Sequence, residues 1–364
     1  MKYVSALCSF VILFAFLPAL FADEMPENVQ VLTSLSRAEL IRTMGFIRAS
    51  LGVRCDYCHV SGGETGPWHF GSDDKDTKKT ARKMMKMVIE INQQNFDGKP
   101  VVSCFTCHQG SVRPQSTIPV PFKSAAPSIV EPQTQPAEKP VLPTAASILD
   151  HYFKAIGSSG KMPLWHSLVL KGKREQEGNP PADVEIREKD PDHWLMVTTG
   201  PQGPMRLGTD GKTVWMQTKE DVHELNSAEA LRFGETLRSM QLVPAMTQDY
   251  EVVHPIDVNG RKAIRLRHRE EKETQTLFFD VESGLLLKWL VEHNSPVGAI
   301  PESYEYDDYK KVGSLLLPFT IRSSYVDQRS TNTRRLTEIK IDAPISDHDF
   351  AMPEQKTGTS GGVH

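Results

Sequence analysis

Two copies of one cysteine pattern constrain this chain more than any other feature of its sequence. Residues 55–59 read Cys-Asp-Tyr-Cys-His and residues 104–108 read Cys-Phe-Thr-Cys-His, so both are C-x-x-C-H. Two thiols three positions apart on one turn can form thioether bonds to the two vinyl groups of a porphyrin, and the adjacent histidine can bind its iron. Each copy therefore predicts one covalently bound haem c, and we expect two in the chain.

Three other uses of paired cysteines stay open as alternatives. Zinc accepts four thiolates, but it gives no reason for a histidine directly after each pair. Two disulfide bonds are another use in an exported protein, and a redox dithiol is a third. Haem attachment explains both motifs best. Its candidate residues are the four cysteines and two histidines of the motifs, namely Cys55, Cys58, His59, Cys104, Cys107 and His108.

The first 22 residues differ from the rest of the chain in hydrophobicity. Lys2 precedes an apolar run from Val4 to Phe21, which ends at Ala22. A basic start, an apolar centre and a small final residue are typical of a secretory signal. We expect residues 1–22 to be a cleaved signal peptide and the mature protein to be periplasmic or membrane-associated. The alternative is an uncleaved anchor, because about 18 apolar residues approach the length of a membrane span.

Composition narrows the classes of protein and partner. The 364 residues include 42 Lys and Arg against 46 Asp and Glu, a formal net charge of −4. Without a basic excess we expect no nucleic-acid partner. Hydrophobic residues make up 39% of the chain, which excludes a polytopic membrane protein. The length is sufficient for two domains.

A helix before the first motif offers a sixth ligand for the first haem iron. Ser36 and Glu39 form a capping-box pattern. Apolar residues at helical spacing follow as far as Leu51, and Gly52 ends the pattern. Met44 lies in the middle of this apolar face. A methionine opposite histidine raises the reduction potential of a haem and suits electron transfer.

A second helix, beginning near residue 74 or 76, precedes the second motif. It carries Met84, Met85 and Met87, and the residues alone leave the choice among these three open. A methionine is more often a core residue than a ligand, and only the neighbouring motif favours ligation. His69 is a rival ligand, but it lies in a glycine-rich loop.

The region of residues 25–112 resembles the cytochrome c subunit of photosynthetic reaction centres. The resemblance rests on short segments: residues 28–32, 36–40, 51–59, 81–87, 91–92 and 104–110. It implies an electron-transfer protein with haem c, in which a methionine on the preceding helix is the sixth ligand. By position this implies Met44 for the first haem and Met84 for the second. The implied partner is a redox protein, either a membrane-bound reaction centre or a respiratory complex.

The rest of the chain divides into a linker, a β-rich domain and a tail. Residues 113–144 contain eight prolines, which is typical of a semi-rigid linker between the haem domain (23–112) and the β-rich domain. Residues 145–156 predict an amphipathic helix closed by Gly157. Short alternating runs between turns then predict an antiparallel meander, with a helical insertion near 228–242. We expect residues 355–364 to be disordered.

The β-rich region, residues 145–354, is similar to the lipoprotein-carrier half-barrel. The carrying residues are turn and strand signals at 209–215, 277–285, 306–309 and 317–319. This resemblance implies a curved antiparallel sheet around a helix, and an apolar ligand such as a lipid or a quinone. An ordinary filled core is the alternative. The expected fold class is thus multidomain, with a mainly α multihaem cytochrome module followed by an α+β antiparallel half-barrel.

These observations predict an exported dihaem cytochrome c that transfers single electrons and is not an enzyme. The histidines of residues 145–354 lack metal-ligand spacing, and the sequence contains no phosphate loop or nucleophile motif. A haem enzyme such as a dihaem peroxidase is one alternative, and it requires an iron with an open position. A lipid- or quinone-binding protein that uses haem as a sensor is the other.

Overall fold

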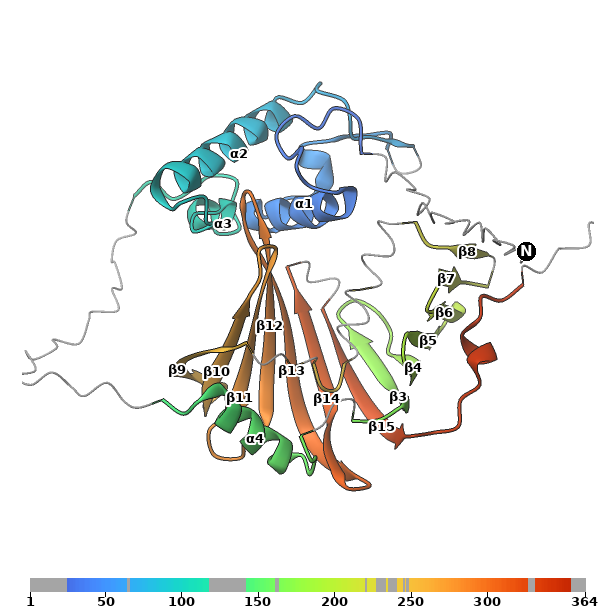
Figure 1. The fold of residues 1–364 in the computed structure, drawn as a ribbon. Coiled ribbons are helices and arrows are strands. Elements are labelled where there is room, and N and C mark those ends of the chain that lie inside the picture. Colours follow the sequence, from blue (N-terminus) through green and yellow to red (C-terminus); the bar gives the residue numbers. More distant parts are fainter. Residues whose placement is uncertain are drawn as a thin grey trace, which may run out of the picture.

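The structure is a computed structural model, shown in Figure 1. It describes residues 25–63, 66–117, 142–160, 164–219, 221–226, 241–244, 249–326 and 331–354, with Gly234 and Met246 in addition. The predicted signal peptide and the predicted tail lie outside the described residues. So do most of the proline-rich linker and most of the predicted insertion at 228–242.

The N-terminal module, residues 25–112, contains three helices. They are α1 (Arg37–Leu51), α2 (Asp76–Asn95) and α3 (Cys104–His108). A 3₁₀ turn (Cys55–Tyr57) and a two-stranded hairpin of β1 (Val60–Ser61) and β2 (Trp68–His69) lie between α1 and α2. Because long irregular segments separate these elements, the expected mainly α description of this module is not confirmed.

The predicted ends of α1 are confirmed by its capping contacts. The Ser36 backbone amide donates to Glu39 Oε2 at 2.8 Å, and the Glu39 amide donates to Ser36 Oγ at 3.3 Å, which completes the capping box. At the other end Gly52 adopts a left-handed conformation with φ of 65°. Glycine permits this conformation without steric cost, so the helix stops here.

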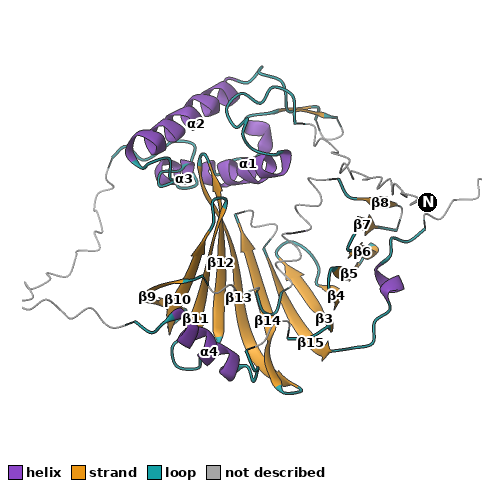
Figure 2. Ribbon diagram, in the orientation of Figure 1, coloured by secondary structure: helices purple, strands orange, loops and turns teal. Residues whose placement is uncertain are grey.

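The β domain, residues 142–354, is one antiparallel sheet with a helix packed on it (Figure 2). The sheet has 13 strands in the order β8-β7-β6-β5-β4-β3-β15-β14-β13-β12-β11-β10-β9, so only β3 and β15 join distant parts of the sequence. The helix is α4 (Ala145–Ala155), which Thr144 caps as its side chain accepts from the Ser147 amide. Its predicted start is confirmed.

The strands of the sheet follow α4 in the chain. They are β3 (Ser167–Gln176), β4 (Ala182–Lys189), β5 (His193–Gly200), β6 (Gly203–Asp210), β7 (Val214–Gln217), β8 (Val222–Glu224), β9 (Glu251–Val258), β10 (Arg261–Arg269), β11 (Glu273–Asp280), β12 (Leu286–Ser295), β13 (Gly298–Val312), β14 (Leu315–Tyr325) and β15 (Asn332–Ile341). A short 3₁₀ helix, η3 (Asp347–Phe350), comes after β15.

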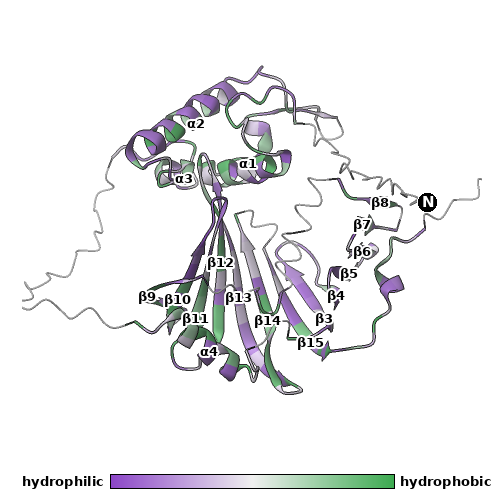
Figure 3. Cartoon of the chain, in the orientation of Figure 1, coloured by the Kyte–Doolittle hydropathy of each residue, from purple (hydrophilic) through white to green (hydrophobic). Residues whose placement is uncertain are grey.

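The main core lies between α4 and one face of the sheet. Ile148 and Tyr152 of α4, and Ile156 directly after it, pack with sheet residues such as Leu266 and Phe279. Figure 3 shows apolar residues along the parts of β11 and β12 nearest to α4. Alternation of buried and exposed residues along the strands is expected when only one face of a sheet is covered.

The N-terminal module lies at one end of the strands, where the hairpin joining β12 to β13 reaches α1 and α3 (Figure 1). Leu32, Leu40 and Phe46 of the module share a hydrophobic cluster with Val297 and Ile300 of this hairpin. The two parts are therefore packed together, although a linker joins them in sequence. In the part of the chain that the structure describes, no helix is long and apolar enough to cross a membrane.

Candidate haem sites

The first motif is held by the start of α2. Cys55 begins the 3₁₀ turn, and the His59 amide donates to the Cys55 carbonyl at 3.0 Å. Thr77 Oγ1 of α2 donates to the Tyr57 carbonyl at 2.6 Å, and Lys75 Nζ, directly before α2, donates to the Asp56 carbonyl. The backbone of the motif is therefore fixed from the outside, which leaves its thiols available for covalent attachment.

An aromatic loop lies beside His59. The Phe70 ring meets the His59 ring edge-on, with centroids 5.2 Å apart, and Trp68 stacks on Phe70 at 5.4 Å. The buried Lys78 ammonium holds this loop by donating to the carbonyls of residues 70, 71 and 72. It also pairs with Asp73 at 3.1 Å. This loop therefore forms an apolar surface next to His59.

The surroundings of His59 favour its neutral form. Burial, followed by the nearby Lys78 ammonium, lowers the pKa of His59 below its usual value. Neutral imidazole is the form of histidine that binds a metal.

The second motif forms the short helix α3, capped by Ser103. The Thr106 amide donates to Ser103 Oγ at 3.3 Å, and the Ser103 amide donates to Thr106 Oγ1 at 3.0 Å. Cys104 is buried and Cys107 is exposed. Burial raises the pKa of the Cys104 thiol to about 11, which keeps it protonated at neutral pH.

His108 is oriented by its own backbone surroundings. Its Nδ1 lies 2.9 Å from the Ser111 carbonyl oxygen, which fixes Nδ1–H as the donor in the neutral ring. That contact leaves Nε2 as the nitrogen with a free lone pair. Histidines that bind metals commonly donate their other ring N–H to a carbonyl in this way.

Two helices brace the second motif. Asn92 of α2 accepts from the Val102 amide at 2.9 Å and donates to the Val102 carbonyl at 2.7 Å. From α1, the Ser50 carbonyl accepts from the Gly110 amide at 2.8 Å. A Cβ on Gly52 would overlap the Gly110 carbonyl oxygen, so glycine is required for this close approach. The structure thus places the end of α1 beside the second motif, although Met44 was assigned from sequence to the first.

The three methionines of α2 differ in how far they are buried. Met85 is 8% exposed and packs in the cluster with Leu40 and Phe46, so it belongs to the core. Met84 and Met87 are 38% and 41% exposed and lie three residues apart on one side of the helix. Met44 is half-buried and packs against the same cluster. Of the three methionines that the sequence left open, Met84 and Met87 are free to reach a group outside the core.

The apolar surface of the module suits large apolar prosthetic groups. Its exposed large hydrophobic side chains lie in or near the motifs and on α2: Tyr57, Trp68, Phe70, Met84, Met87, Val101, Phe105 and Val112. A porphyrin has an extended apolar face, and covering such side chains would remove them from water. The residues present therefore fit haem c.

The zinc and disulfide alternatives gain no support from this arrangement. All four motif cysteines are free thiols. Among the described residues, no three His, Cys, Asp or Glu side chains gather to hold a metal ion.

A comparison with known families decides the assignment of this module. Residues 19–156 match the family of photosynthetic reaction centre cytochrome c subunits. The resemblance predicted for residues 25–112 is confirmed. This family belongs to the c-type cytochromes, which implies covalently bound haem c and an electron-transfer role for the matched region.

Curated relatives agree over the same stretch. The reaction centre cytochrome c subunit of Thermochromatium tepidum is 36% identical over 98 residues, which is 26% of this chain and 23% of the relative. Its counterpart in Roseobacter denitrificans is 36% identical over 97 residues, or 24% of this chain and 25% of the relative. Cytochrome c-554 of Chloroflexus aurantiacus is 34% identical over 91 residues, which is 23% of this chain and 20% of the relative. The chain spans about a quarter or less of the length of each.

Solved structures match the β domain. A LolA superfamily protein from Nitrosomonas europaea covers 58% of this chain and 98% of its own, with 13% identity and a TM-score of 0.37. A DUF1329 family protein from Desulfovibrio piger covers 57% and 96%, with 9% identity and a TM-score of 0.38. The first belongs to the LolA superfamily, and the identities and TM-scores are too low for any conclusion about the function of this chain.

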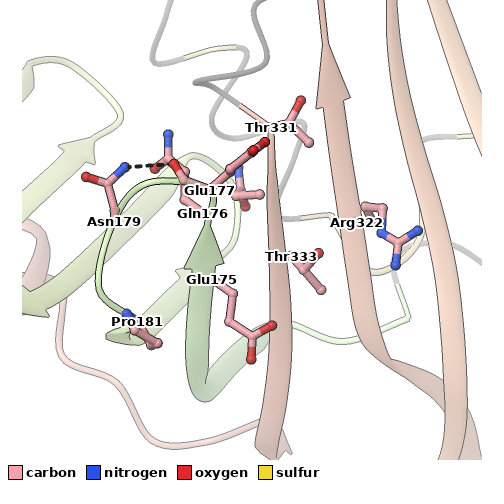
Figure 4. Close-up of a pocket in the computed structure, with 9 residues that line it drawn as sticks. Glu175, Gln176, Glu177, Asn179, Pro181, Arg322, Thr331 and Thr333 are labelled. Atoms are coloured by element: carbon pink, nitrogen blue, oxygen red, sulfur yellow. Dashed lines mark hydrogen bonds between the residues drawn. The ribbon is translucent and has the colours of Figure 1, made fainter.

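A polar pocket lies at the ends of β3 and β15 (Figure 4). Its volume is about 560 Å³, and Glu175, Glu177, Arg322 and Asn332 are among its lining residues. A lining of this kind does not suit the lipid or quinone that the sequence predicted.

Sequence reasoning missed the residues that hold the motifs in place. Ser103, Ser111 and Lys78 are polar residues without a recognisable spacing relative to the cysteines. Asn92 had a signal, because it lies in one of the segments that carry the family resemblance. Its role as a backbone clamp on Val102 follows only from the structure.

Proposed function

We propose that this chain is an exported dihaem c-type cytochrome that carries single electrons between redox proteins. Its four motif cysteines would hold two haems, and His59 and His108 would be the proximal ligands. Met44 and Met84 would be the sixth ligands of the first and second haem. The observation that carries the proposal is the repeated C-x-x-C-H motif in a region that matches reaction centre cytochromes.

The protein's own residues would orient and shield the haems. Bound haem c would supply one-electron redox chemistry at each site. The Ser111 carbonyl accepts from His108 Nδ1–H, which would leave Nε2 for the iron, and Phe70 with Trp68 would shield His59 once haem c covered them. Contacts that hold both histidines in place would suit electron transfer, which requires little movement around the haem.

The structure also supports the second methionine assignment. Met84 is exposed while Met85 fills the core, so Met84 can turn toward a haem without opening a cavity. Met87 has comparable exposure and is the control position. A peroxidase would instead need one iron without a methionine ligand.

The partners and the place of action follow from the same reasoning. The implied donor or acceptor is a redox protein, either a membrane-bound reaction centre or a respiratory complex, and the implied compartment is the periplasm. The β domain would add binding of a lipid or a quinone. Beside its apolar inner face lies Glu188, and burial raises the pKa of this carboxyl group to about 7, so a proton can be exchanged there near neutral pH.

Haem stoichiometry tests the proposal. The full chain should be produced in a host that attaches haem c, and haem should be counted per polypeptide by the pyridine haemochrome spectrum. We expect two haems, and one in a Cys104→Ser, Cys107→Ser double variant. A wild-type chain with fewer than two, or with turnover of peroxide, would contradict it.

A binding assay tests the β domain separately. The full haem-loaded chain should be titrated with a fluorescent fatty acid and with a quinone analogue. Saturable binding that weakens when Trp194→Ala alters the inner face beside Glu188 is the expected result. No binding of either probe would remove the apolar ligand from the proposal and leave the electron-transfer role intact.

A further inference from the structure

The turn between β12 and β13 lies inside the N-terminal module rather than in solvent. This turn, Ser295–Gly298, ends β12 and begins β13. Val297 is 0% exposed, and it shares a hydrophobic cluster with Phe46 of α1, Met85 of α2 and Cys104 of α3. Hairpin turns are normally at the surface, where their backbone groups meet water. This turn instead completes the core of the module.

Gly298 brings the backbone of the hairpin against the second motif. Its φ is 142°, and a Cβ built there would lie 2.6 Å from the Ser103 Cβ and 2.9 Å from the Phe46 Cε1. Both contacts are far shorter than a Cβ allows. Ser295 Oγ donates to the Gly298 carbonyl at 2.6 Å, so the turn is also fixed internally. The approach to Ser103 therefore depends on the missing side chain.

Ser103 is the residue through which this contact reaches the haem site. It caps α3 and immediately precedes Cys104, the first attachment cysteine of the second motif. A shift of Ser103 would move the start of the helix that carries Cys104, Cys107 and His108. The hairpin thus bears directly on the backbone that sets the position of the second haem.

The stem of the hairpin is anchored in the sheet by a buried polar cluster. His293 Nε2 lies 2.9 Å from Glu302 Oε1, and His293 Nδ1 lies 3.2 Å from Glu273 Oε2. Tyr304 donates to Glu302 Oε2 at 2.7 Å. These side chains join β11, β12 and β13. Buried networks of this kind resist deformation, so the stem is a firm support for the turn.

A neighbouring turn braces α1 at its start. Lys272, between β10 and β11, pairs with Glu39 at 3.0 Å, and its carbonyl accepts from the Asn294 amide at 2.8 Å. The Lys272 side chain is largely exposed, so the pair contributes little energy. The pair shows that the β10–β11 turn, as well as the β12–β13 turn, contacts the module.

We infer that the β12–β13 hairpin is a positioning element of the second haem site, through Val297 and Gly298 acting on Ser103 and α3. This inference rests on the proposed dihaem function. The half-barrel thereby has a direct mechanical role in the cytochrome, and the second haem depends on it.

Substitution at Gly298 tests the inference with a matched control on the adjoining turn of the same strand. Gly298→Ala adds a methyl group against Ser103 and Phe46. Gly313→Ala adds one beyond the other end of β13, also at a positive φ of 60°, where the nearest atom is Ile341 Cδ1 at 3.8 Å. Both positions have a positive φ, but only the first touches Ser103, the cap of the helix that carries the second motif. Ile300→Val and Ile300→Ala serve as a conservative and a disruptive change in the shared cluster.

The first readout is the redox titration of the haem-loaded full chain. Gly298→Ala and Ile300→Ala should shift the midpoint potential of the second haem and leave that of the first unchanged. Gly313→Ala should leave both unchanged, and Ile300→Val should restore the wild-type value. Equal shifts of both haems, or no shift in either disruptive variant, would overturn the inference.

The second readout does not require haem. In the full chain produced without haem attachment, the alkylation rate of Cys104 should rise at least severalfold in Gly298→Ala and stay at the wild-type value in Gly313→Ala. An unchanged Cys104 rate in Gly298→Ala would overturn the inference, whatever the haem content of the protein. Failure to attach two haems would instead defeat the proposed function.

Discussion

The two parts of this protein complete their hydrophobic cores in different ways. Among the described residues, eight of the eleven exposed large hydrophobic side chains lie in the N-terminal module and three, Ile256, Val281 and Met352, lie in the β domain. The β domain covers its apolar face with α4, whereas the module leaves apolar side chains around its motifs. The difference shows that the module leaves apolar surface that the haem c implied by its family would cover, whereas the β domain covers its own apolar face.

Removal of haem should have the largest effect and should fall on one part only. In the full chain without haem attachment, we expect residues 25–112 to lose protection from proteolysis by at least an order of magnitude, because their apolar surface stays uncovered. The β domain should stay protected. Limited proteolysis with mass spectrometry of the fragments measures this protection. Equal loss of protection in both parts would contradict the difference between them.

A cavity in the sheet core should produce the opposite pattern. Phe279 is 1% exposed and packs against Tyr152 at 5.2 Å between ring centroids. Phe279→Ala should lower the unfolding free energy of the β domain by about 3–5 kcal/mol. Urea titration followed by circular dichroism measures this, with the neighbouring Val281→Ala as an exposed control. If Phe279→Ala cost less than Val281→Ala, the assignment of the core face would be wrong.

The cap of α1 offers a smaller test within the module. Ser36→Ala removes the capping box and should cost about 1 kcal/mol of stability. Ser36→Asp keeps an oxygen that can accept from the Glu39 amide, so it should restore most of the loss. Thermal unfolding of the haem-loaded chain compares the two. An equal loss of stability in both variants would show that the capping hydrogen bond is not the source of the stability.

The buried cluster at the stem of the hairpin should respond to pH. Burial lowers the pKa of His293, but the carboxylates of Glu273 and Glu302 outweigh burial, so the net effect is a raised pKa. A histidine whose pKa is higher in the folded state stabilises the protein fully below its unfolded pKa of about 6.5. That contribution is lost as the pH rises through the folded value.

The corresponding experiment compares unfolding temperatures of the wild type and His293→Gln between pH 5 and pH 9. The difference between the two proteins should be greatest near pH 5 and should narrow toward pH 9. His348→Gln, in the short helix after β15, is the control for loss of a histidine outside this cluster. A difference in unfolding temperature that grows with pH would contradict a raised pKa of His293 in the folded protein.

Part of the molecule could be predicted from the sequence because its signals are local. The capping box at Ser36, the stop at Gly52 and the turns at Gly211, Gly260 and Gly284 depend on a few adjacent residues. The two motifs were recognised for the same reason, since five consecutive residues contain both the attachment chemistry and the proximal ligand.

Other features could not be predicted because they depend on distant contacts. β9 and β13 contain Pro255 and Pro301, and β13 also begins at a glycine, so both look like turns in the sequence. Pairing across the sheet overrides these signals. Val297 packs inside the module although it lies more than 190 positions after Cys104 in the sequence. No periodicity in the sequence indicates this contact.

We propose that the N-terminal module holds two low-spin haems, each with a histidine and a methionine ligand. The most direct measurement is a redox-titrated optical and EPR spectrum of the mature chain beside Met44→Ala, Met84→Ala and the control Met87→Ala. We predict two low-spin irons, with each of the first two variants losing the methionine signature of one haem and Met87→Ala losing neither. A high-spin iron in the unmutated protein would contradict the claim and move the assignment to haem catalysis or sensing.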